Sequence, residues 1–204
     1  MILSFYDKYI LPKFLNCACG SKPINYQREK IVPLAEGTVL DVGIGSGLNI
    51  PYYNKSKIEC LYGLDPSIEL LNLAKSLAKK NELEIEFIEC GAEAIPLPND
   101  SIDTVVITYT LCTIPDTQLS NQEIMRVLKP NGKLLFCEHG LAPDINIAKW
   151  QKRINPIWNK IAGGCNLNRD IPNLIRSSGL KISNMEEMYP VSYTHLTLPT
   201  ILLV

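Results

Sequence analysis

The stretch that decides the fold is VLDVGIGSGLN, residues Val39–Asn49. It reads as a short apolar strand that ends in three alternate glycines, Gly43, Gly45 and Gly47. Alternate glycines after a strand let the backbone turn sharply and leave no side chains in the way, so a ligand can lie against the main chain. The stretch therefore predicts a nucleotide-type pocket at the end of a buried strand.

Two residues within this stretch indicate which nucleotide the pocket holds. The dinucleotide fingerprint has glycines at its first, third and sixth positions, and the sixth position here is Leu48. Asp41 stands two residues before the first glycine, where an acid would repel phosphates but would suit a ligand that carries an ammonium and a sulfonium. The stretch thus favours S-adenosylmethionine (SAM), and a nicotinamide dinucleotide stays open as the alternative.

Length, charge and cysteine content bound the class of protein. A chain of 204 residues has the size of one domain. A formal net charge of -1 gives no basic field, which argues against a nucleic-acid partner bound through its phosphates. The seven cysteines are odd in number and no secretory segment precedes them, so we expect reduced thiols in the cytoplasm rather than a disulfide framework.

Residues 1–31 are expected to form an N-terminal cap segment. The first 15 residues are apolar but contain Asp7, Lys8 and Lys13, so they are too short and too charged to span a bilayer. Their amphipathic pattern leaves an interfacial anchor open as the alternative to packing on the domain. The expected location is cytoplasmic, with peripheral membrane contact through residues 1–15 under that alternative.

Beyond the cap, residues 32–190 alternate apolar strands with amphipathic helices. Strands are expected over 38–42, 58–64, 85–88, 102–108, 133–138 and 181–188. Helices are expected over 24–32, 67–80, 117–128 and 170–178, with a turn over 129–132 and a less regular region over 140–164. This alternation predicts an α/β fold, a doubly wound and mostly parallel sheet whose ligands bind beyond the carboxyl ends of the strands.

The last 14 residues, 191–204, are interpreted as a non-native tail. Residues 191–200, VSYTHLTLPT, resemble the translation of a sequencing-library adapter, and such scars are excluded from fold reasoning. A genuine strand is the alternative, because Thr, Tyr and Leu suit strands. Under the adapter interpretation the natural sequence continues differently after Pro190, and the final strand of the sheet is missing or replaced.

Asp65 ends the second expected strand, 22 residues after Gly43. A carboxylate at that position can accept hydrogen bonds from both hydroxyls of a ribose, in NAD and in SAM alike. A surface turn is the plainer interpretation, since Asp-Pro is common turn chemistry. The glycine turn upstream favours the ribose contact.

Four motifs occur in an order and spacing that together are specific. They are DVGIGSG (41–47), GLDP (63–66), AEAIPLP (92–98) and RVLKPNG (126–132). The chain resembles the class I SAM-dependent methyltransferases over residues 32–180. The resemblance implies the Rossmann-like fold of that family, SAM as cofactor, and an enzyme that methylates a small-molecule acceptor.

The resemblance also assigns the cofactor contacts residue by residue. The methionine part of SAM would lie against Asp41 and the glycine turn, the ribose against Asp65, and the adenine edge against Ala92 and Glu93. The full expected set is Asp41, Gly43, Gly45, Gly47, Asn49, Asp65, Pro66, Ala92, Glu93 and Thr108. One position departs from the family: Gly91 stands where many relatives have an Asp that contacts the adenine amino group, so backbone groups are expected to read the adenine.

Four further segments resemble the branch of the family that contains thiol methyltransferases. They are LCTIPD (111–116), EH (138–139), WQ (150–151) and GGCNLNR (163–169). The implied acceptor is small and apolar, a thiol or a lipid-like molecule. A nicotinamide-dependent oxidoreductase and a catalytically silent SAM-fold binding protein are the alternative functions.

His139 and Glu138 are the candidate catalytic residues. His139 is the only histidine before the tail and follows the fifth expected strand, so it is the one imidazole available there as a base near neutral pH. Adjacent strand residues point to opposite faces, so the two side chains are not expected to act as a pair. No metal site is expected: the Cys17-Ala18-Cys19 pair is weak evidence for zinc, and Cys112 and Cys165 are interpreted mainly as small buried hydrophobes.

Overall fold

The computed structural model describes residues 11, 16, 18–188 and 200–203. In that part of the chain, seven strands form one sheet in the order β3-β2-β1-β4-β5-β7-β6. The strands are β1 (Gly37–Val42), β2 (Ile58–Asp65), β3 (Glu86–Glu89), β4 (Ile102–Thr108), β5 (Leu128–His139), β6 (Met185–Met188) and β7 (Thr200–Leu203). Strands β1 to β5 are parallel to one another, as the sequence predicts, and β7 is antiparallel to both β5 and β6.

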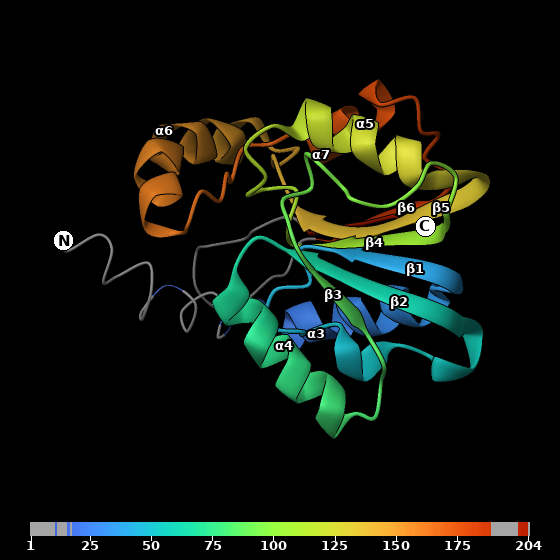
Figure 1. Ribbon diagram of the computed structural model, residues 1–204. Coiled ribbons are helices and arrows are strands. Elements are labelled where there is room, and N and C mark those ends of the chain that lie inside the picture. The colour runs from blue at the N-terminus through green and yellow to red at the C-terminus, as the bar shows by residue number, and fades with distance from the viewer. Residues whose placement is uncertain (1–10, 12–15, 17, 189–199, 204) are drawn as a thin grey trace.

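Helices cover both faces of the sheet (Figure 1). They are α3 (Lys22–Ile31), α4 (Ile68–Lys80), α5 (Thr117–Val127), α6 (Ile145–Ile161) and α7 (Ile171–Ser177), with short 3-10 turns η2 (Val32–Leu34), η3 (Ile50–Tyr52) and η4 (Lys55–Lys57). In Figure 1, α3 and α4 lie on one side of the sheet and α5 and α7 on the other. This is the doubly wound arrangement that strand and helix alternation predicts.

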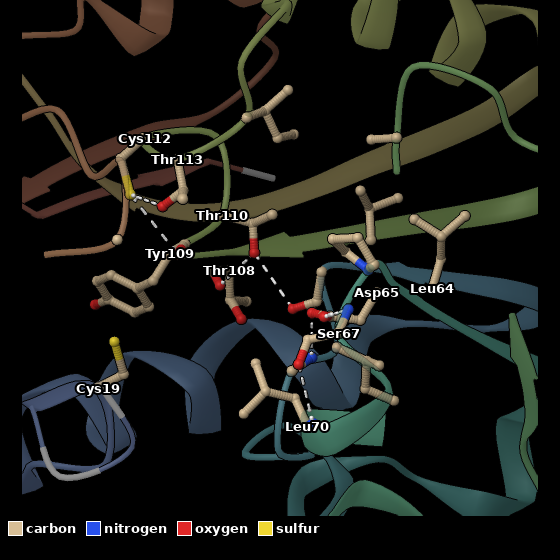
Figure 2. Close-up of a pocket in the computed structure, with 18 of the residues that line it drawn as sticks. Cys19, Leu64, Asp65, Ser67, Leu70, Thr108, Tyr109, Thr110, Cys112 and Thr113 are labelled. Atoms are coloured by element: carbon tan, nitrogen blue, oxygen red, sulfur yellow. Dashed lines mark hydrogen bonds between the residues drawn. The ribbon is translucent and has the colours of Figure 1, made fainter. Parts of the chain in front are cut away.

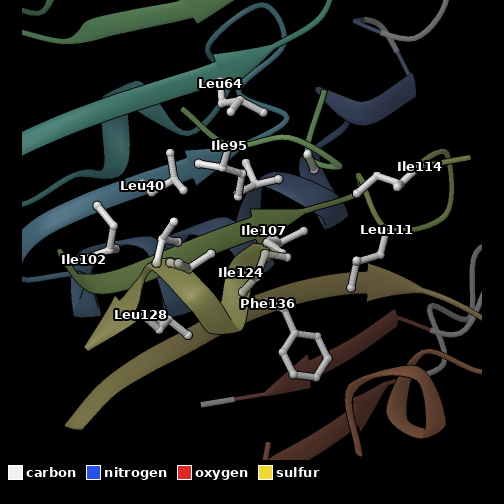
Figure 3. Packing of buried hydrophobic residues seen from close by; sticks show 14 of the residues in the cluster. Leu40, Leu64, Ile95, Ile102, Ile107, Leu111, Ile114, Ile124, Leu128 and Phe136 are labelled. Atoms are coloured by element: carbon white, nitrogen blue, oxygen red, sulfur yellow. The ribbon is translucent and has the colours of Figure 1, made fainter. Parts of the chain in front are cut away.

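The core lies on both faces because the central strands have apolar residues at successive positions. In β4, Val105 and Ile107 join the cluster under α5 and α7, and Val106 between them joins the cluster under α3. Figure 3 shows the first cluster, where Phe136 and Ile107 of the sheet lie in the same core as Ile124 of α5. A strand buried on both faces holds its carboxyl end in a fixed place, which is where the site is built.

Helix α6 corrects the prediction of an irregular region over residues 140–164. The Asp144 side chain caps it by accepting hydrogen bonds from the backbone N–H groups of Asn146 and Ile147. Among its residues only Gln151 is buried, and Pro156 lies inside the helix. A proline inside a segment normally ends a helix, so the sequence shows no uninterrupted helical pattern over this region.

The predicted turn over residues 129–132 is also corrected, because these residues lie inside β5. Ile102 of β4 lies opposite Leu128, whereas Thr104 lies opposite Lys133, so the register shifts and the intervening residues of β5 bulge out of the ladder. A bulge can accommodate Pro130 and Gly132, which are typical of turns, without ending the strand.

The position of the final strand is filled. β7 lies between β5 and β6, with Leu203 opposite both Phe136 and Met185. The sequence predicts a last strand that is missing or replaced, and the four residues that fill the position belong to the segment interpreted as a non-native tail. Residues 191–199, like most of residues 1–17, lie outside the described part of the chain, and so does the predicted membrane contact. None of the helices described has the length and apolar character needed to cross a bilayer.

Candidate active site

A cavity of about 360 Å³ opens where β1, β2, β4 and β5 end, at the carboxyl edge of the parallel strands (Figure 2). Most of the residues that the sequence predicts for the site line it: Gly43, Gly45, Asn49, Asp65, Pro66, Ala92, Glu93, Thr108 and His139. Asp41, Gly47 and Glu138 are absent from its wall. The structure places these three behind the wall, where they hold lining residues in position.

Gly45 leaves open space where a side chain would stand. Its φ is +56°, and a Cβ on it would meet only the Gly43 carbonyl at 3.8 Å and Asp65 Oδ2 at 3.9 Å. The backbone N–H of Gly45 donates a hydrogen bond to Asp65 Oδ2 at 3.0 Å. The glycine turn thus forms a cradle that stays open to a ligand and fixes the neighbouring carboxylate.

Gly47 has a packing role. Its φ is +88°, and a Cβ there would lie 2.6 Å from Ile50 Cδ1 and 3.2 Å from Ala74 Cα of helix α4. Close packing of a helix against the turn is the task of the last glycine in the dinucleotide fingerprint. In this chain Gly47 performs it one position earlier, which explains why Leu48 can occupy the fingerprint position and line the cavity.

Asp65 presents a positioned carboxylate. Its Oδ1 accepts a hydrogen bond from the backbone N–H of Ser67 at 2.8 Å, and its Oδ2 accepts the one from Gly45. Burial raises the pKa of this carboxyl above its usual range, and the two backbone hydrogen bonds oppose that rise. Each oxygen keeps a lone pair, so the pair of oxygens can accept from the two hydroxyls of a ribose.

Asp41 lies under the cavity floor. Asn49 Nδ2 lies 3.0 Å from each of its oxygens, and the Tyr53 hydroxyl donates to Oδ2 at 2.9 Å. Burial raises the pKa of Asp41 to about 6, against the opposing effect of these hydrogen bonds. Asn49 Oδ1 in turn accepts from Thr108 Oγ1 at 3.0 Å. The acid that the sequence assigns to the methionine part therefore orients Asn49, which itself lines the cavity.

Arg28 of α3 is a functional candidate that sequence reasoning missed. It is 3% exposed and lines the cavity. Its Nε donates to Asn49 Oδ1 at 3.0 Å, one guanidinium nitrogen donates to the Cys19 carbonyl at 2.8 Å, and the guanidinium carbon lies 4.9 Å from the centre of the Tyr109 ring. In sequence it is one charged residue of a polar helix, and no local signal distinguishes it from a solvent-exposed arginine.

The loop that follows β3 forms another wall of the cavity. Ala92 is buried there, and Glu93 Oε1 accepts a hydrogen bond from the backbone N–H of Asp116 at 3.3 Å. Arg126 of α5 holds the loop through hydrogen bonds to the carbonyls of Ile95 and Leu97, at 2.7 and 2.8 Å. The motif that begins at Arg126 thus acts on the site by fixing the loop that begins at Ala92.

Glu138 holds the loop that follows β4. Its Oε1 accepts hydrogen bonds from the backbone N–H groups of Thr110 and Leu111, at 2.6 and 2.9 Å. The side chain is fully buried, and burial raises its pKa to about 7 despite those hydrogen bonds. Glu138 thus fixes the backbone of this loop. A direct part in the reaction, alone or with His139, stays a prediction.

His139 lies on the opposite side of the strand from Glu138, in the wall of the cavity. Its Nε2 lies 3.2 Å from Cys165 Sγ, and its ring stacks on Tyr109 with 6.5 Å between centroids. Burial by itself lowers the pKa of the imidazole, but the hydrogen bond and charge of Cys165 and the charge of Glu138 outweigh it and raise the pKa. Its Nδ1 is buried and has no hydrogen-bond partner among the described residues.

The end of the cavity around His139 is apolar. Cys112 and Cys165 line it, and both pack with Ala162 and Trp158 from the end of α6 and the turn that follows. The hydrogen bond with Cys112, followed by burial, raises the pKa of the Cys165 thiol well above its usual range. Figure 2 shows Cys112 and Tyr109 at one end of the cavity and Asp65 with Ser67 at the other. A polar end that suits a ribose is thus joined to an apolar end that suits an acceptor.

The remaining acceptor-side candidates have structural contacts. Arg169 donates a hydrogen bond to the Leu111 carbonyl. Gln151 is buried and holds the chain after β5 through the Ala142 N–H and the Gly140 carbonyl. Trp150 is 47% exposed and points away from the core.

Sequence comparison matches residues 40–136 to a family model described as a methyltransferase domain. The chain is 36% identical over 139 residues to thiol S-methyltransferase TMT1B of Rattus norvegicus, a match that covers 66% of this chain and 56% of that protein. It is 30% identical over 167 residues to thiol S-methyltransferase TMT1A of Homo sapiens, covering 79% of this chain and 67% of that one. The chain thus spans between half and two thirds of the length of these relatives.

Structure comparison finds the same fold in solved proteins. The YcgJ protein of Bacillus subtilis superposes with a TM-score of 0.70 at 18% identity, covering 87% of this chain and 94% of that one. A SAM-dependent methyltransferase of Thermotoga maritima superposes with a TM-score of 0.67 at 16% identity, covering 100% of this chain and 99% of that one. At these identities the likeness establishes the fold, and the chemistry has to come from the site itself.

Proposed function

The chain belongs to the class I SAM-dependent methyltransferases, and on that premise we propose that it transfers a methyl group from SAM to the thiol of a small, apolar acceptor. The observation that carries the proposal is one continuous cavity with the Asp65 carboxylate at one end and His139 in an apolar wall at the other. Such a cavity can align a charged donor with an apolar acceptor and exclude water from both.

The donor end offers groups that fit SAM. Asp65 would accept hydrogen bonds from the ribose hydroxyls, and the cradle at Gly45 gives the main chain access to the ligand. The guanidinium of Arg28 would pair with the carboxylate of the methionine part, because it is a buried cation in the cavity wall. Bound SAM supplies a methyl group on a positively charged sulfur, so alignment and a dry pocket are what the protein has to add.

The acceptor end favours a thiol over a more polar nucleophile. Cys112 and Cys165 line it, Trp158 packs behind them, and His139 is the imidazole that the described residues offer there. A thiol has a pKa of about 8.5, so its proton is lost more easily than that of a hydroxyl. We place His139 at this end as the residue that promotes loss of the thiol proton. The thiol methyltransferases among the relatives support this choice of acceptor.

Ligand binding and turnover test the proposal. Isothermal titration calorimetry with SAM should show one site, and NAD should show none; binding of NAD alone would overturn the proposal. Mass spectrometry should then detect methylated product with apolar alkyl thiols and none with matched amines or phenols. Tight SAM binding without turnover of any thiol, amine or phenol would favour the silent binding protein instead.

We also propose a division of the chain into a cap, residues 1–31, a methyltransferase domain, residues 32–190, and a non-native tail, residues 191–204. The burial of Ile31 and Arg28 from α3 supports the cap, and the resemblance of residues 191–200 to a translated adapter supports the tail. Resequencing the genomic locus tests the tail: uninterrupted codons for residues 191–204 would make β7 a native strand. A cytoplasmic location stays a prediction.

A further inference from the structure

Three side chains with metal-binding atoms meet at the acceptor end of the cavity. They are Cys112, His139 and Cys165, which come from the loop after β4, the last position of β5 and the loop after α6. Their ligand atoms all lie within 4.8 Å of one another, and all three residues are buried. The same three line the cavity. Residues so far apart in sequence are brought together only by the tertiary fold.

The separations suit a single small ion. Zinc lies about 2.3 Å from cysteine sulfur and about 2.0–2.1 Å from histidine nitrogen, which puts the ligand atoms of a tetrahedral site roughly 3.5–3.8 Å apart. Cys165 Sγ is already 3.2 Å from His139 Nε2. The widest separation is at most 4.8 Å, so about 1 Å of side-chain adjustment would bring it into that range.

The backbone around the cluster is held by hydrogen bonds, and the three side chains contact one another. The Cys112 carbonyl accepts hydrogen bonds from the backbone and side-chain N–H groups of Asn166, at 2.9 and 3.0 Å. Cys112 Sγ also lies 3.4 Å from the Thr113 hydroxyl and 3.7 Å from the Tyr109 carbonyl, which are long contacts. His139 Nε2 faces Cys165 Sγ at 3.2 Å, so the imidazole presents a nitrogen to the two thiols, and their buried polar atoms have chiefly one another as partners.

We propose that Cys112, His139 and Cys165 bind a soft divalent ion, Zn²⁺, whose fourth position opens into the cavity and takes the acceptor thiol. Three protein ligands and one open position are the pattern of catalytic zinc sites. A site of two thiolates and one imidazole binds zinc in preference to magnesium or calcium, which favour oxygen ligands. Arg169, which donates a hydrogen bond to the Leu111 carbonyl, places a positive charge near both cysteines that would offset part of the negative charge of the thiolates.

The inference rests on the proposed function and assigns His139 its part in it, as a ligand. When the acceptor binds, its S–H bond breaks, the proton passes to water, and a bond from sulfur to zinc forms, since a metal-bound thiol is deprotonated. The acceptor sulfur then bonds to the methyl carbon while the bond from that carbon to the donor sulfur breaks, its electron pair staying on the donor. The thioether product carries no charge and is a weaker ligand, so it leaves.

Metal titration of the purified full chain tests the site. The protein is stripped with a chelator under a non-thiol reductant and titrated with Zn²⁺ by calorimetry and with Co²⁺ by absorbance, where thiolate ligation gives a charge-transfer band. One ion per chain should bind. Cys112→Ser, Cys165→Ser and His139→Ala should each lower the affinity at least 100-fold, while the matched control Cys60→Ser, on β2, should bind as the wild type does.

Three outcomes separate the site from the function. Unchanged SAM binding in each variant shows that the variant is folded, so its loss of zinc then supports the site. Absence of zinc binding, or equal binding in all the variants, would overturn it. If zinc binds at these residues but no thiol is methylated, the metal site stands and the proposed function fails; if the chelated protein methylates thiols at the full rate, the function stands and the inferred role of the ion fails.

Discussion

The side-chain amide nitrogen of Asn49 lies 3.0 Å from both carboxylate oxygens of Asp41. Asp41 is fully buried and is held further by the Tyr53 hydroxyl. It therefore acts on the cavity through Asn49, which joins it to Arg28 and Thr108. Asp41, which the sequence predicts to contact the ligand, instead anchors a buried hydrogen-bond network.

Replacing Asp41 should therefore lower the free energy of unfolding of the protein. Asp41→Ala leaves the Asn49 amide and the Tyr53 hydroxyl buried without their acceptor, and each such group costs about 1–3 kcal/mol. We expect urea denaturation to show a loss of that order, together with weaker SAM binding. Glu59→Ala, at an exposed position of β2, is the control and should change neither. Full stability with SAM affinity alone reduced would mean that Asp41 contacts the ligand directly.

Arg28→Met should weaken binding of the amino-acid part of the donor selectively. Loss of a charged hydrogen-bonding partner costs about 1.5–3 kcal/mol, or roughly 10- to 100-fold in affinity. We expect that loss for S-adenosylhomocysteine, which carries the carboxylate, and little change for methylthioadenosine, which lacks it. Calorimetry with the two ligands checks this, and an equal loss for both would place Arg28 away from the carboxylate.

Gly45→Ala should impair SAM binding more than folding. A φ of +56° costs a non-glycine residue about 1–2 kcal/mol, and the added methyl projects into the cavity beside Asp65. Gly179→Ala is a matched control, because Gly179 has a φ of +96° and no atom within 4 Å of the added methyl. Both variants should lose similar stability in thermal melts, and only Gly45→Ala should lose SAM affinity, by at least about 10-fold. Equal SAM affinity in the two variants would contradict the proposal that SAM lies against the backbone at Gly45.

Glu138→Gln should change how stability depends on pH. Burial raises the pKa of Glu138 to about 7 in the folded chain, from 4.5, so the folded state holds the proton more tightly. Its contribution to stability is complete below about pH 4.5 and is lost as the pH rises through 7, by about 1–3 kcal/mol. Denaturation at pH 5 and pH 8 should show a smaller fall for Glu138→Gln than for the wild type.

Glu138→Ala is the companion variant. Glu138→Ala removes the oxygen that accepts hydrogen bonds from the Thr110 and Leu111 N–H groups. Glu138→Gln keeps an acceptor oxygen in the side-chain amide. Glu138→Ala should therefore be less stable than Glu138→Gln at every pH, by about 1–3 kcal/mol for each N–H that stays unpaired. If the two variants are equally stable, these backbone hydrogen bonds contribute nothing measurable.

His139→Ala should slow thiol methylation without weakening SAM binding. His139 lies at the acceptor end of the cavity, away from Asp65, whose carboxylate is proposed to bind the ribose. The proposed contribution of His139 is to the loss of the thiol proton. We expect kcat to fall about 10²- to 10³-fold with an alkyl thiol. The fall should be much smaller with an aryl thiol that is already ionised at the assay pH. An equal fall for both acceptors would indicate a structural role for His139.

Much of the fold follows from local sequence patterns. The apolar strands and the glycine turn are readable because a strand buried on both faces needs successive apolar residues, and a turn with positive φ needs glycine. Helix α6 was not readable, because it contains Pro156 and a proline normally ends a helix. The bulge in β5 was not readable either, since Pro130 and Gly132 have the composition of a turn.

The sequence by itself determined the family, the donor and the position of the pocket, because the motifs from Asp41 to Gly132 are local and keep their order along the chain. Only the tertiary structure decided which residues face the cavity. It placed Asp41, Gly47 and Glu138 behind the wall and brought Arg28 into it. It also gathered Cys112, His139 and Cys165 within 4.8 Å. Contacts between residues 20 to 60 positions apart depend on how strands and loops pack, and no local pattern encodes them.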